Sequence, residues 1–354
     1  MRAIINGVGS YIPEVRVKNE DFLKHQFHSD YQKIITEDSR SIIRKFEKIT
    51  GISERRYVSE ALNNDDIALI AAERALEQST IDKEQLDYVI VAHNYGNVEY
   101  GSNRSDFMPS LATRVKHRLG IINNNCVAYD IVFGCPGWVE AMIQSTIFIQ
   151  SGQAKNCLVI GSETLSRVVD PADRDSMIFA DGAGACVLTS NSTESKGVLG
   201  FASQTFSFEE ADFLYNAKSF GQEENEQDRF IKMQGRKIYE FALTNVPKAM
   251  QVCLDKAQIS IDELAKVFLH QANEKMDEAI VKRLYKLYKN RDFNLDVMPM
   301  NIHELGNSSV ATIPTLYHQV IHGEKFGHEV RENDLVMFAS VGAGMNINAL
   351  VYQY

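Results

Sequence analysis

A cysteine at a tight turn is the first residue in the chain whose type and setting suggest chemistry. Cys135 lies in Phe133-Gly134-Cys135-Pro136-Gly137-Trp138, between a strand-like run and a helical pattern that extends to Gln150. Pro136 suits the first position of that helix, because its missing N–H costs nothing there. The positive end of the helix dipole would favour the thiolate of Cys135, which is the nucleophile that covalent thioester catalysis needs. A small buried residue in a tight turn is the alternative interpretation.

A histidine and an asparagine occupy two further positions where catalytic groups are often found. His270 directly follows the buried strand predicted at 267–269, and open α/β sheets place their sites at such strand ends. Asn307, in Gly306-Asn307-Ser308-Ser309, precedes a helix predicted from Ile313. Its side chain suits either an N-cap or an N–H donor to a developing oxyanion. Each residue alone also fits a purely structural role.

The elements that must position these residues are those of an α/β protein. Short runs rich in Val and Ile alternate with longer helical patterns, and that alternation is typical of the class. The pattern predicts a helix over 66–78 and strands at 87–92, 157–161, 185–188, 335–339 and 348–352.

An internal repeat predicts that the core is duplicated. Residues 75–91 align without a gap on residues 253–269, about half a chain length away, and each copy reads as helix, turn and strand. Gly182-Ala183-Gly184 and Gly342-Ala343-Gly344 resemble each other as hairpin-like elements. The repeat predicts an N-terminal half over 1–195 and a C-terminal half over 196–354. Chance similarity between two amphipathic units is the alternative.

Two segments look like insertions into that core. Residues 22–48 are charged and aromatic, without a clean strand. Residues 209–229 are acidic, which indicates a solvated loop or a lid, and long loops of this kind tend to border active sites.

Composition excludes several classes of protein. The net charge of −10 over 354 residues argues against a nucleic-acid surface spread over the whole molecule. Five widely spaced cysteines without a Cys-x-x-Cys pair argue against a disulfide scaffold or a zinc ribbon and favour a reducing compartment. With no signal-peptide pattern and no apolar run of about 20 residues, we expect a cytoplasmic protein without a membrane span. No metal and no organic cofactor is implied.

Taken in order, the motifs resemble those of the β-ketoacyl-acyl-carrier-protein synthase III-like condensing enzymes of the thiolase superfamily. The matching pieces extend over nearly the whole chain. They are Thr50–Arg56, Pro109–Ala112, the Cys135 turn, Asp170–Arg174, Asp181–Ala185, His270–Asn273, Gly306–Ser309 and Gly342–Gly344.

The resemblance implies a thiolase-like fold, with a duplicated βαβαβαββ core in five αβαβα layers, and a homodimer. It also implies an acyltransferase in which Cys135 takes an acyl group from a thioester. His270 and Asn307 would bind the thioester carbonyl of malonyl-acyl carrier protein (malonyl-ACP), promote loss of CO₂ and stabilise the enolate. That carbanion attacks the acyl-cysteine and gives a β-ketoacyl product. A neutral His and Asn pair supplies donors to the enolate oxygen without a full charge.

The resemblance assigns supporting roles as well. The backbone N–H groups of Cys135 and of the Gly342-Ala343-Gly344 turn would form the oxyanion hole for acyl transfer, and Asn273 would support His270. Met108 takes the place of the acyl gate that comes from the partner subunit, and suggests a longer or irregular acyl chain. Trp138, beside the nucleophile, stands where the family commonly has Phe, and is expected in the acyl pocket.

The coenzyme A site departs from the family pattern. Arg174 matches the Arg that holds the adenine, but Lys45 stands at the position of the family's Trp and Ile49 at that of a neighbouring Arg. The donor is therefore left open between acyl-CoA and acyl-ACP. His303 and Glu304 are unusual before the Asn motif, and are taken as loop residues or as acid/base groups behind the site.

A basic patch after the His motif matches the family's dock for acyl carrier protein. Lys275, Lys282 and Arg283 fall on one face of a predicted helix. A cationic patch on an acidic protein would steer an acidic carrier. A solvated helix face is the alternative.

Several activities are compatible with this constellation. The leading one is decarboxylative Claisen condensation with malonyl-ACP or another carrier-bound acceptor, in a specialised lipid or polyketide pathway. The runner-up couples two acyl chains, a fatty thioester with a β-ketoacyl-ACP, as dialkylresorcinol-forming and head-to-head condensing relatives do. Hydroxymethylglutaryl-CoA synthase-like chemistry would need a glutamate base that the sequence does not identify. A non-catalytic partner of acyl carrier protein and a redox thiol protein are alternatives of other classes.

Overall fold

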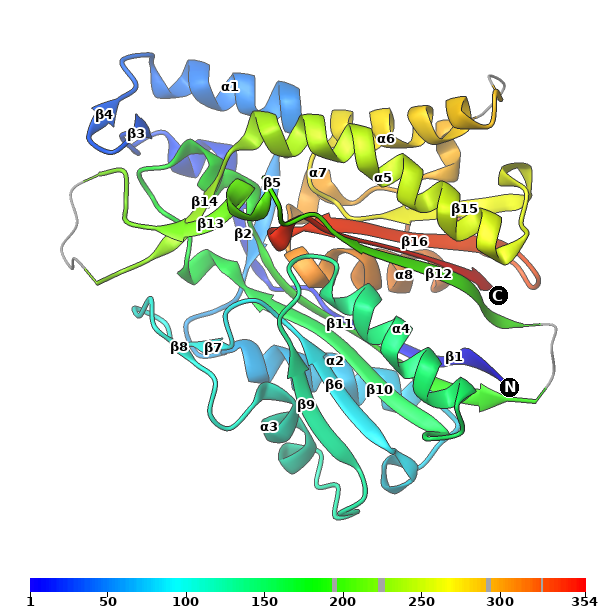
Figure 1. The fold of residues 1–354 in the computed structure, drawn as a ribbon. Helices are drawn as coiled ribbons and strands as arrows, with labels where there is room; N and C mark the ends of the chain where they lie inside the picture. Colours follow the sequence, from blue (N-terminus) through cyan, green and yellow to red (C-terminus); the bar gives the residue numbers. More distant parts are fainter. Residues whose placement is uncertain (193–195, 222–226, 291–293, 326) are drawn as a thin grey trace.

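The computed structural model of the chain describes residues 1–192, 196–221, 227–290, 294–325 and 327–354. Two main sheets lie across the molecule, each built from one part of the chain (Figure 1). The strands of the first sheet are, in spatial order, β1 (Arg2–Tyr11), β11 (Asp181–Asn191), β10 (Asn156–Thr164), β6 (Tyr88–Ala92) and β9 (Val127–Ile131). Those of the second are β12 (Gly197–Thr205), β17 (Asn346–Gln353), β16 (Leu335–Gly342) and β15 (Leu264–Leu269).

Three layers of helices enclose these two sheets. Helices α4 (Gly137–Gln150) and α8 (Thr312–Ile321) are buried between the sheets, in one core that contains residues of both. Helices α2 (Asn64–Gln78) and α3 (Leu111–Arg118) cover the outer face of the first sheet. Helices α5 (Gly235–Ala257) and α6 (Glu274–Leu287) cover the outer face of the second. The predicted five-layered αβαβα fold is confirmed (Figure 1).

The predicted repeat has a structural counterpart at the same residues. A 3-10 turn, Lys83–Gln85, precedes β6, and the corresponding turn Ile261–Glu263 precedes β15. Each turn is closed by a capping box, in which the residue before the turn and its last residue satisfy each other's backbone N–H groups. The two Gly-Ala-Gly elements are not equivalent, however. Gly182–Gly184 lies inside β11, whereas Gly342–Gly344 turns the chain between β16 and β17.

The segment 22–48 contains more regular structure than predicted. It holds two short paired strands, β3 (His28–Asp30) and β4 (Lys33–Ile34), and most of α1 (Ser39–Thr50). The Asp38 side chain accepts a hydrogen bond from the backbone N–H of Ser41 at the start of α1, and Gly51 ends the helix with a left-handed φ of 78°. The expectation of no clean strand here was wrong, because the strands are too short to give an alternating pattern.

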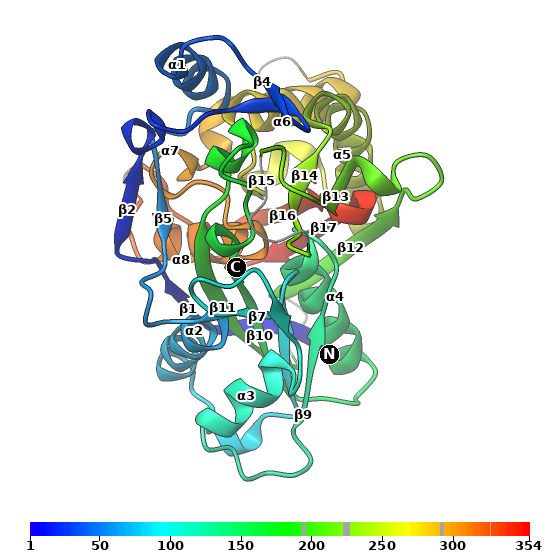
Figure 2. The same ribbon diagram turned by 90° about the vertical axis from the view of Figure 1, so that its left-hand side faces the viewer.

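The described part of the acidic segment 209–229 contains the first strand of a hairpin, whose second strand follows directly after the segment. Strand β13 (Leu214–Ala217) pairs antiparallel with β14 (Phe230–Met233), and residues 222–226, with three of the predicted acidic side chains, lie outside the described residues. Figure 2 looks onto the end of the molecule that carries this hairpin and two further short strand pairs. Those pairs are β2 (Val15–Lys18) with β5 (Glu54–Tyr57), and β7 (Asn97–Val98) with β8 (Ser105–Asp106). None of the described helices is both long and apolar enough to cross a bilayer.

Candidate active site

The turn that carries Cys135 packs directly against the turn between β16 and β17. A Cβ atom on Gly134, which has a φ of 70°, would lie 2.7 Å from the backbone N and O of Ala343. A Cβ atom on Gly342 would lie 2.4 Å from the backbone N of Cys135. The two turns therefore touch backbone to backbone, at the carboxyl end of β9 and the start of α4. Pro136 is the N-cap of α4, so the helix begins at Gly137, one residue later than predicted.

The thiol of Cys135 is protonated at neutral pH in this environment. Burial raises the pKa of Cys135 to about 11, a hydrogen bond with the Ser309 side chain lowers it, and the nearby carboxyl of Glu163 raises it. The thiolate that the helix N-terminus was expected to favour is therefore not the resting form, because the loss of water around the sulfur outweighs the dipole. The thiol has to lose this proton if its sulfur is to act as a nucleophile.

His270 is a neutral, buried imidazole at the end of β15. Its backbone N–H donates to Ala339 O at 2.9 Å, and only 3% of the residue is exposed. Burial lowers the pKa of His270 to about 4, so the ring is uncharged at pH 7. Its Nδ1 lies 2.8 Å from Thr312 Oγ1, and that hydroxyl lies 2.9 Å from the carbonyl oxygen of Ser309.

The side chain of Asn307 is oriented by its own turn. Its Oδ1 accepts the backbone N–H of Ser309 at 2.8 Å, so its Nδ2 is left as the donor. The Asn307 backbone bonds to Ile178 O and Ala180 N, which ties the turn to the segment before β11. Helix α8 begins at Thr312 with Ala311 as its N-cap, so the N-cap alternative for Asn307 is wrong.

A buried carboxyl that sequence reasoning missed lies behind the thiol. Glu163 Oε1 accepts hydrogen bonds from the backbone N–H and from Nδ2 of Asn94, each at 2.6 Å. Burial raises the pKa of Glu163 to about 8. Asn94 follows β6 and Glu163 lies near the end of β10, so both carry the same signal that singled out His270: a polar residue at the end of a buried strand.

A pocket of about 350 Å³ opens beside Cys135 and is large enough for part of an acyl chain. The acidic hairpin forms one wall, as the prediction of a loop bordering the site anticipated. The other walls come from the Cys135 turn and from the turn at 343–346. The apolar and aromatic lining residues are Tyr95, Val132, Phe133, Leu165, Phe179, Leu214, Tyr215, Ile231 and Ala343.

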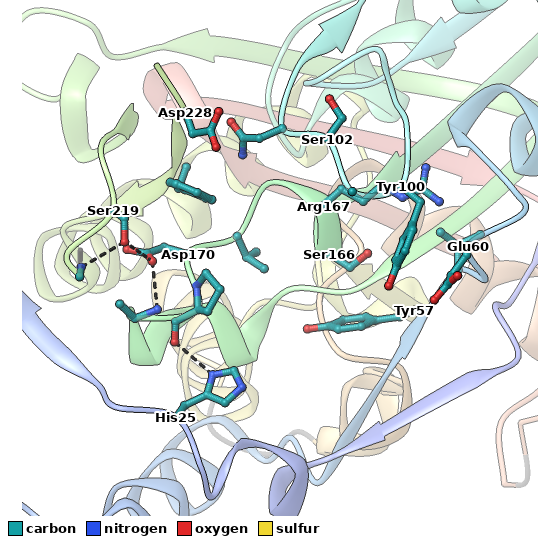
Figure 3. Close-up of a pocket in the computed structure, with 18 of the residues that line it drawn as sticks. His25, Tyr57, Glu60, Tyr100, Ser102, Ser166, Arg167, Asp170, Ser219 and Asp228 are labelled. Carbon is teal, nitrogen blue, oxygen red and sulfur yellow. Dashed lines mark hydrogen bonds between the residues drawn. The ribbon is translucent and has the colours of Figure 1, made fainter. Parts of the chain in front are cut away.

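A larger cavity of about 1070 Å³ lies on the other side of the same wall (Figure 3). Leu165 and Ile231 face the Cys135 pocket, whereas their neighbours Ser166 and Phe230 face the larger cavity. Figure 3 shows Tyr57, Glu60 and Tyr100 in that cavity, and its lining includes none of Cys135, His270 and Asn307. We assign the candidate site to the smaller pocket because Cys135 lines it; His270 and Asn307 are in the lining of neither cavity.

A buried lysine anchors the hairpin that separates the two cavities. Lys232, on β14, forms ion pairs with Asp170 and, at 3.1 Å, with Asp173, and its Nζ lies 3.3 Å from the centre of the Phe220 ring. The side chains of Lys232 and Asp170 are fully buried. Hydrogen bonds from the Ser219 hydroxyl and the Phe220 N–H complete the environment of the Asp170 carboxylate.

Removing that lysine is expected to destabilise the fold strongly. Lys232→Met leaves two buried carboxylates without their cation, and breaking a buried pair in this way costs about 3–5 kcal/mol. Urea unfolding measures the change in the free energy of unfolding. The matched control is Lys282→Met, which breaks the exposed pair with Glu278 and should cost less than about 1 kcal/mol. Similar small losses in both variants would contradict the anchoring role.

The two predicted acyl-pocket residues lie away from the pocket in this chain. Trp138 is buried in the core, edge-on to Phe338 with 5.7 Å between the rings, and is not among the lining residues. Met108 is 87% exposed and also does not line the pocket. Asn273 caps α6, accepting the backbone N–H of Met276 at 3.1 Å, and among the described residues it makes no hydrogen bond to His270.

The residues expected to bind coenzyme A lie on the surface. The Arg174 side chain is 60% exposed and its Nε lies 3.7 Å from Asp175 Oδ1. Lys45 pairs with Glu37 at 2.6 Å, and Ile49 is exposed.

The predicted docking residues lie exposed on α6. Lys275, Lys282 and Arg283 are all exposed; Lys282 pairs with Glu278, and Arg283 donates to Leu243 O on α5. His303 and Glu304 lie in the short helix α7 (Ile302–Leu305) rather than in a loop. The His303 ring lies 3.0 Å from Glu274 at the start of α6.

Comparison with known proteins points to one family. Residues 129–206 match the family model for 3-oxoacyl-[acyl-carrier-protein (ACP)] synthase III, and residues 254–354 match the model for its C-terminal part. The chain is 30% identical to the β-ketoacyl-[acyl-carrier-protein] synthase III of Neisseria meningitidis serogroup B, over 99% of both proteins. It is 31% identical to the protein of that name from Porphyra purpurea, over 99% of this chain and 98% of the relative.

Solved structures show the same similarity in three dimensions. The crystal structure of β-ketoacyl-[acyl carrier protein] synthase III from Thermus thermophilus superposes with a TM-score of 0.81 at 28% identity. The match covers 99% of this chain and 98% of that one.

Proposed function

Because the chain belongs to the 3-oxoacyl-[acyl-carrier-protein] synthase III family, it is a condensing acyltransferase, and we propose that it extends an acyl group held on Cys135. The extender is malonyl-ACP and the product is a β-ketoacyl-ACP. The observation that carries this proposal is the contact between the Cys135 turn and the Gly342–Gly344 turn, beside an apolar pocket.

In the first step the acyl group moves from a donor thioester to Cys135. The sulfur attacks the thioester carbonyl, the new C–S bond forms, and the donor's C–S bond breaks. The proton of the Cys135 thiol ends on the departing thiol. The backbone N–H groups of Cys135 and of the Gly342–Gly344 turn stabilise the oxyanion that develops between these events.

In the second step His270 and Asn307 bind the thioester carbonyl of malonyl-ACP. CO₂ leaves, the resulting enolate forms a C–C bond to the acyl carbon, and the bond between that carbon and the sulfur of Cys135 breaks. The released thiolate takes up a proton from water. Asn307 Nδ2 is available because Oδ1 is held by Ser309. The Thr312 hydroxyl has one proton, which it donates to the Ser309 carbonyl oxygen at 2.9 Å. Donation from His270 Nε2 requires the tautomer without a proton on Nδ1, in which this hydroxyl turns its proton to Nδ1, 2.8 Å away.

Carrier binding and assembly belong to the same proposal. Lys275, Lys282 and Arg283 on α6 receive the acidic acyl carrier protein, and the acyl donor is acyl-CoA or acyl-ACP. The chain forms a homodimer through β9, one of the two edge strands of the first sheet, where Val127 and, directly after the strand, Val132 are exposed. Met108 then gates the acyl pocket of the partner subunit. Sedimentation velocity should give twice the chain mass; a monomer at micromolar concentration would overturn the dimer.

The division into halves near residue 195 and the cytoplasmic location are proposed on separate grounds. The strands of one sheet all precede that point and those of the other all follow it. All five cysteines are free thiols, which suits a reducing compartment.

The function is tested by reconstitution. The protein is incubated with a panel of acyl-CoAs or acyl-ACPs and malonyl-ACP, and intact mass detects the carrier-bound product. A β-ketoacyl-ACP two carbons longer than the donor acyl group supports the proposal. A product formed only when a β-ketoacyl-ACP replaces malonyl-ACP would favour coupling of two acyl chains. No product from any combination would favour a binding partner without catalysis.

A further inference from the structure

One residue outside the catalytic trio contacts all three of its members, directly or through one side chain. Ser309 is 2% exposed and follows Asn307 by two positions. Ser309 and Cys135 line the same pocket, and hydrogen bonding by the Ser309 side chain lowers the pKa of the Cys135 thiol. The Ser309 backbone N–H donates to Asn307 Oδ1, and its carbonyl oxygen lies 2.9 Å from the Thr312 hydroxyl that contacts His270. Its φ is +53°, a conformation that non-glycine residues rarely adopt and that recurs at functional sites.

The direction of the bond between Ser309 and Cys135 follows from counting protons. Glu163 Oε1 accepts hydrogen bonds from the backbone N–H and from the Nδ2 of Asn94. The atom of the Asn94 side-chain amide that faces Glu163 is therefore its nitrogen and not its oxygen. The same Nδ2 lies 3.0 Å from Ser309 Oγ, which therefore accepts. The single proton of the Ser309 hydroxyl is then available to the sulfur of Cys135.

We propose that Ser309 is a positioning residue whose hydroxyl, oriented by Glu163 through Asn94, donates a hydrogen bond to the sulfur of Cys135. This inference rests on the proposed function, since it assigns Cys135 as the nucleophile. A donor aimed at sulfur stabilises the negative charge that develops there as the thiol loses its proton. It counteracts the burial that holds the pKa of Cys135 near 11.

The titratable groups around the thiol set the background for a pH measurement. Glu163 and Tyr95 lie close enough to Cys135 for their charges to affect it, and Asp181 on β11 acts in turn on Glu163. Each of these groups is present in every variant below. A difference in the apparent pKa of Cys135 between variants is therefore due to the Ser309 hydroxyl.

The test is the pH dependence of Cys135 alkylation by iodoacetamide, with the site located by peptide mass. The other four cysteines are buried, and the reaction needs no acyl substrate. In Ser309→Ala we expect the apparent pKa of Cys135 to rise and the rate at pH 8 to fall about tenfold. The rate constant for acyl loading should fall by a similar factor with KM unchanged.

Two further variants keep the result interpretable. Ser308→Ala removes a hydroxyl from the neighbouring residue, which is also buried, and should leave the profile unchanged. Ser309→Gly also removes the Ser309 hydroxyl but tolerates the positive φ, so it serves if the alanine variant does not fold. Alkylation profiles of folded Ser309→Ala or Ser309→Gly that superimpose on the parent's would overturn the proposal. If the parent alkylates normally but accepts no acyl group, the function fails and the positioning role stands.

Discussion

Cys135→Ala is expected to abolish acyl transfer. Without the sulfur no covalent intermediate forms, and losing a nucleophile that acts in concert with its neighbours lowers the rate by at least about 10⁴-fold. Intact mass after exposure to acyl-CoAs or acyl-ACPs should show the acyl increment on the parent protein and none on the variant. The increment also identifies the chain length that the pocket of about 350 Å³ accepts.

A second thiol provides the matched control. Cys126 precedes β9 and is buried, so Cys126→Ala removes a sulfur without touching the pocket. It should load like the parent. An acyl increment on Cys135→Ala, or its loss from Cys126→Ala, would show that the nucleophile had been assigned to the wrong residue.

Asn307→Asp is expected to separate the two halves of the reaction. The carboxylate keeps an oxygen for the Ser309 N–H, so the turn is preserved, but the donor to the malonyl thioester carbonyl is lost. Removing one such donor costs about 10²–10³ in rate. Malonyl-ACP decarboxylation, followed as CO₂ release, should fall by that factor, while acyl loading of Cys135 stays within a few-fold of the parent.

Asn273→Asp is the control, because it makes the same change at a residue whose oxygen caps a helix. The Asp oxygen still accepts the Met276 N–H, so both steps should proceed at the parent's rates. Equal losses of loading and decarboxylation in Asn307→Asp would point to a damaged turn rather than a missing donor.

The layered fold and the places of the three catalytic candidates follow from local patterns in the sequence. Strand ends and turns are encoded over a few residues, and the repeat at 75–91 and 253–269 reproduces the same helix, turn and strand. The spacing of Cys135, His270 and Asn307 along the chain says nothing about their distances. That information came from the resemblance and from the way the two halves pack.

What the sequence did not predict depends on contacts between distant residues. Lys232 forms ion pairs with Asp170 and Asp173, which lie some 60 positions away in the chain. Without knowledge of these ion pairs, the sequence of the hairpin predicts only a polar loop. The pKa of Cys135 reflects how much protein surrounds the sulfur, which local sequence does not report. Trp138 was expected in the pocket because it lies beside Cys135, but it occupies the helix face that turns toward Phe338.

The backbone contact between Gly134 and Ala343, and between Gly342 and Cys135, has a consequence for how such an enzyme diversifies. The proposed oxyanion-binding atoms belong to the main chain, whereas the pocket is shaped by side chains such as Leu214 and Ile231. Substrate range can therefore drift through single substitutions on the hairpin without disturbing the chemistry. At the two glycines almost no substitution is tolerated, so a mutational library should show variation at the hairpin and near-invariance at the turns.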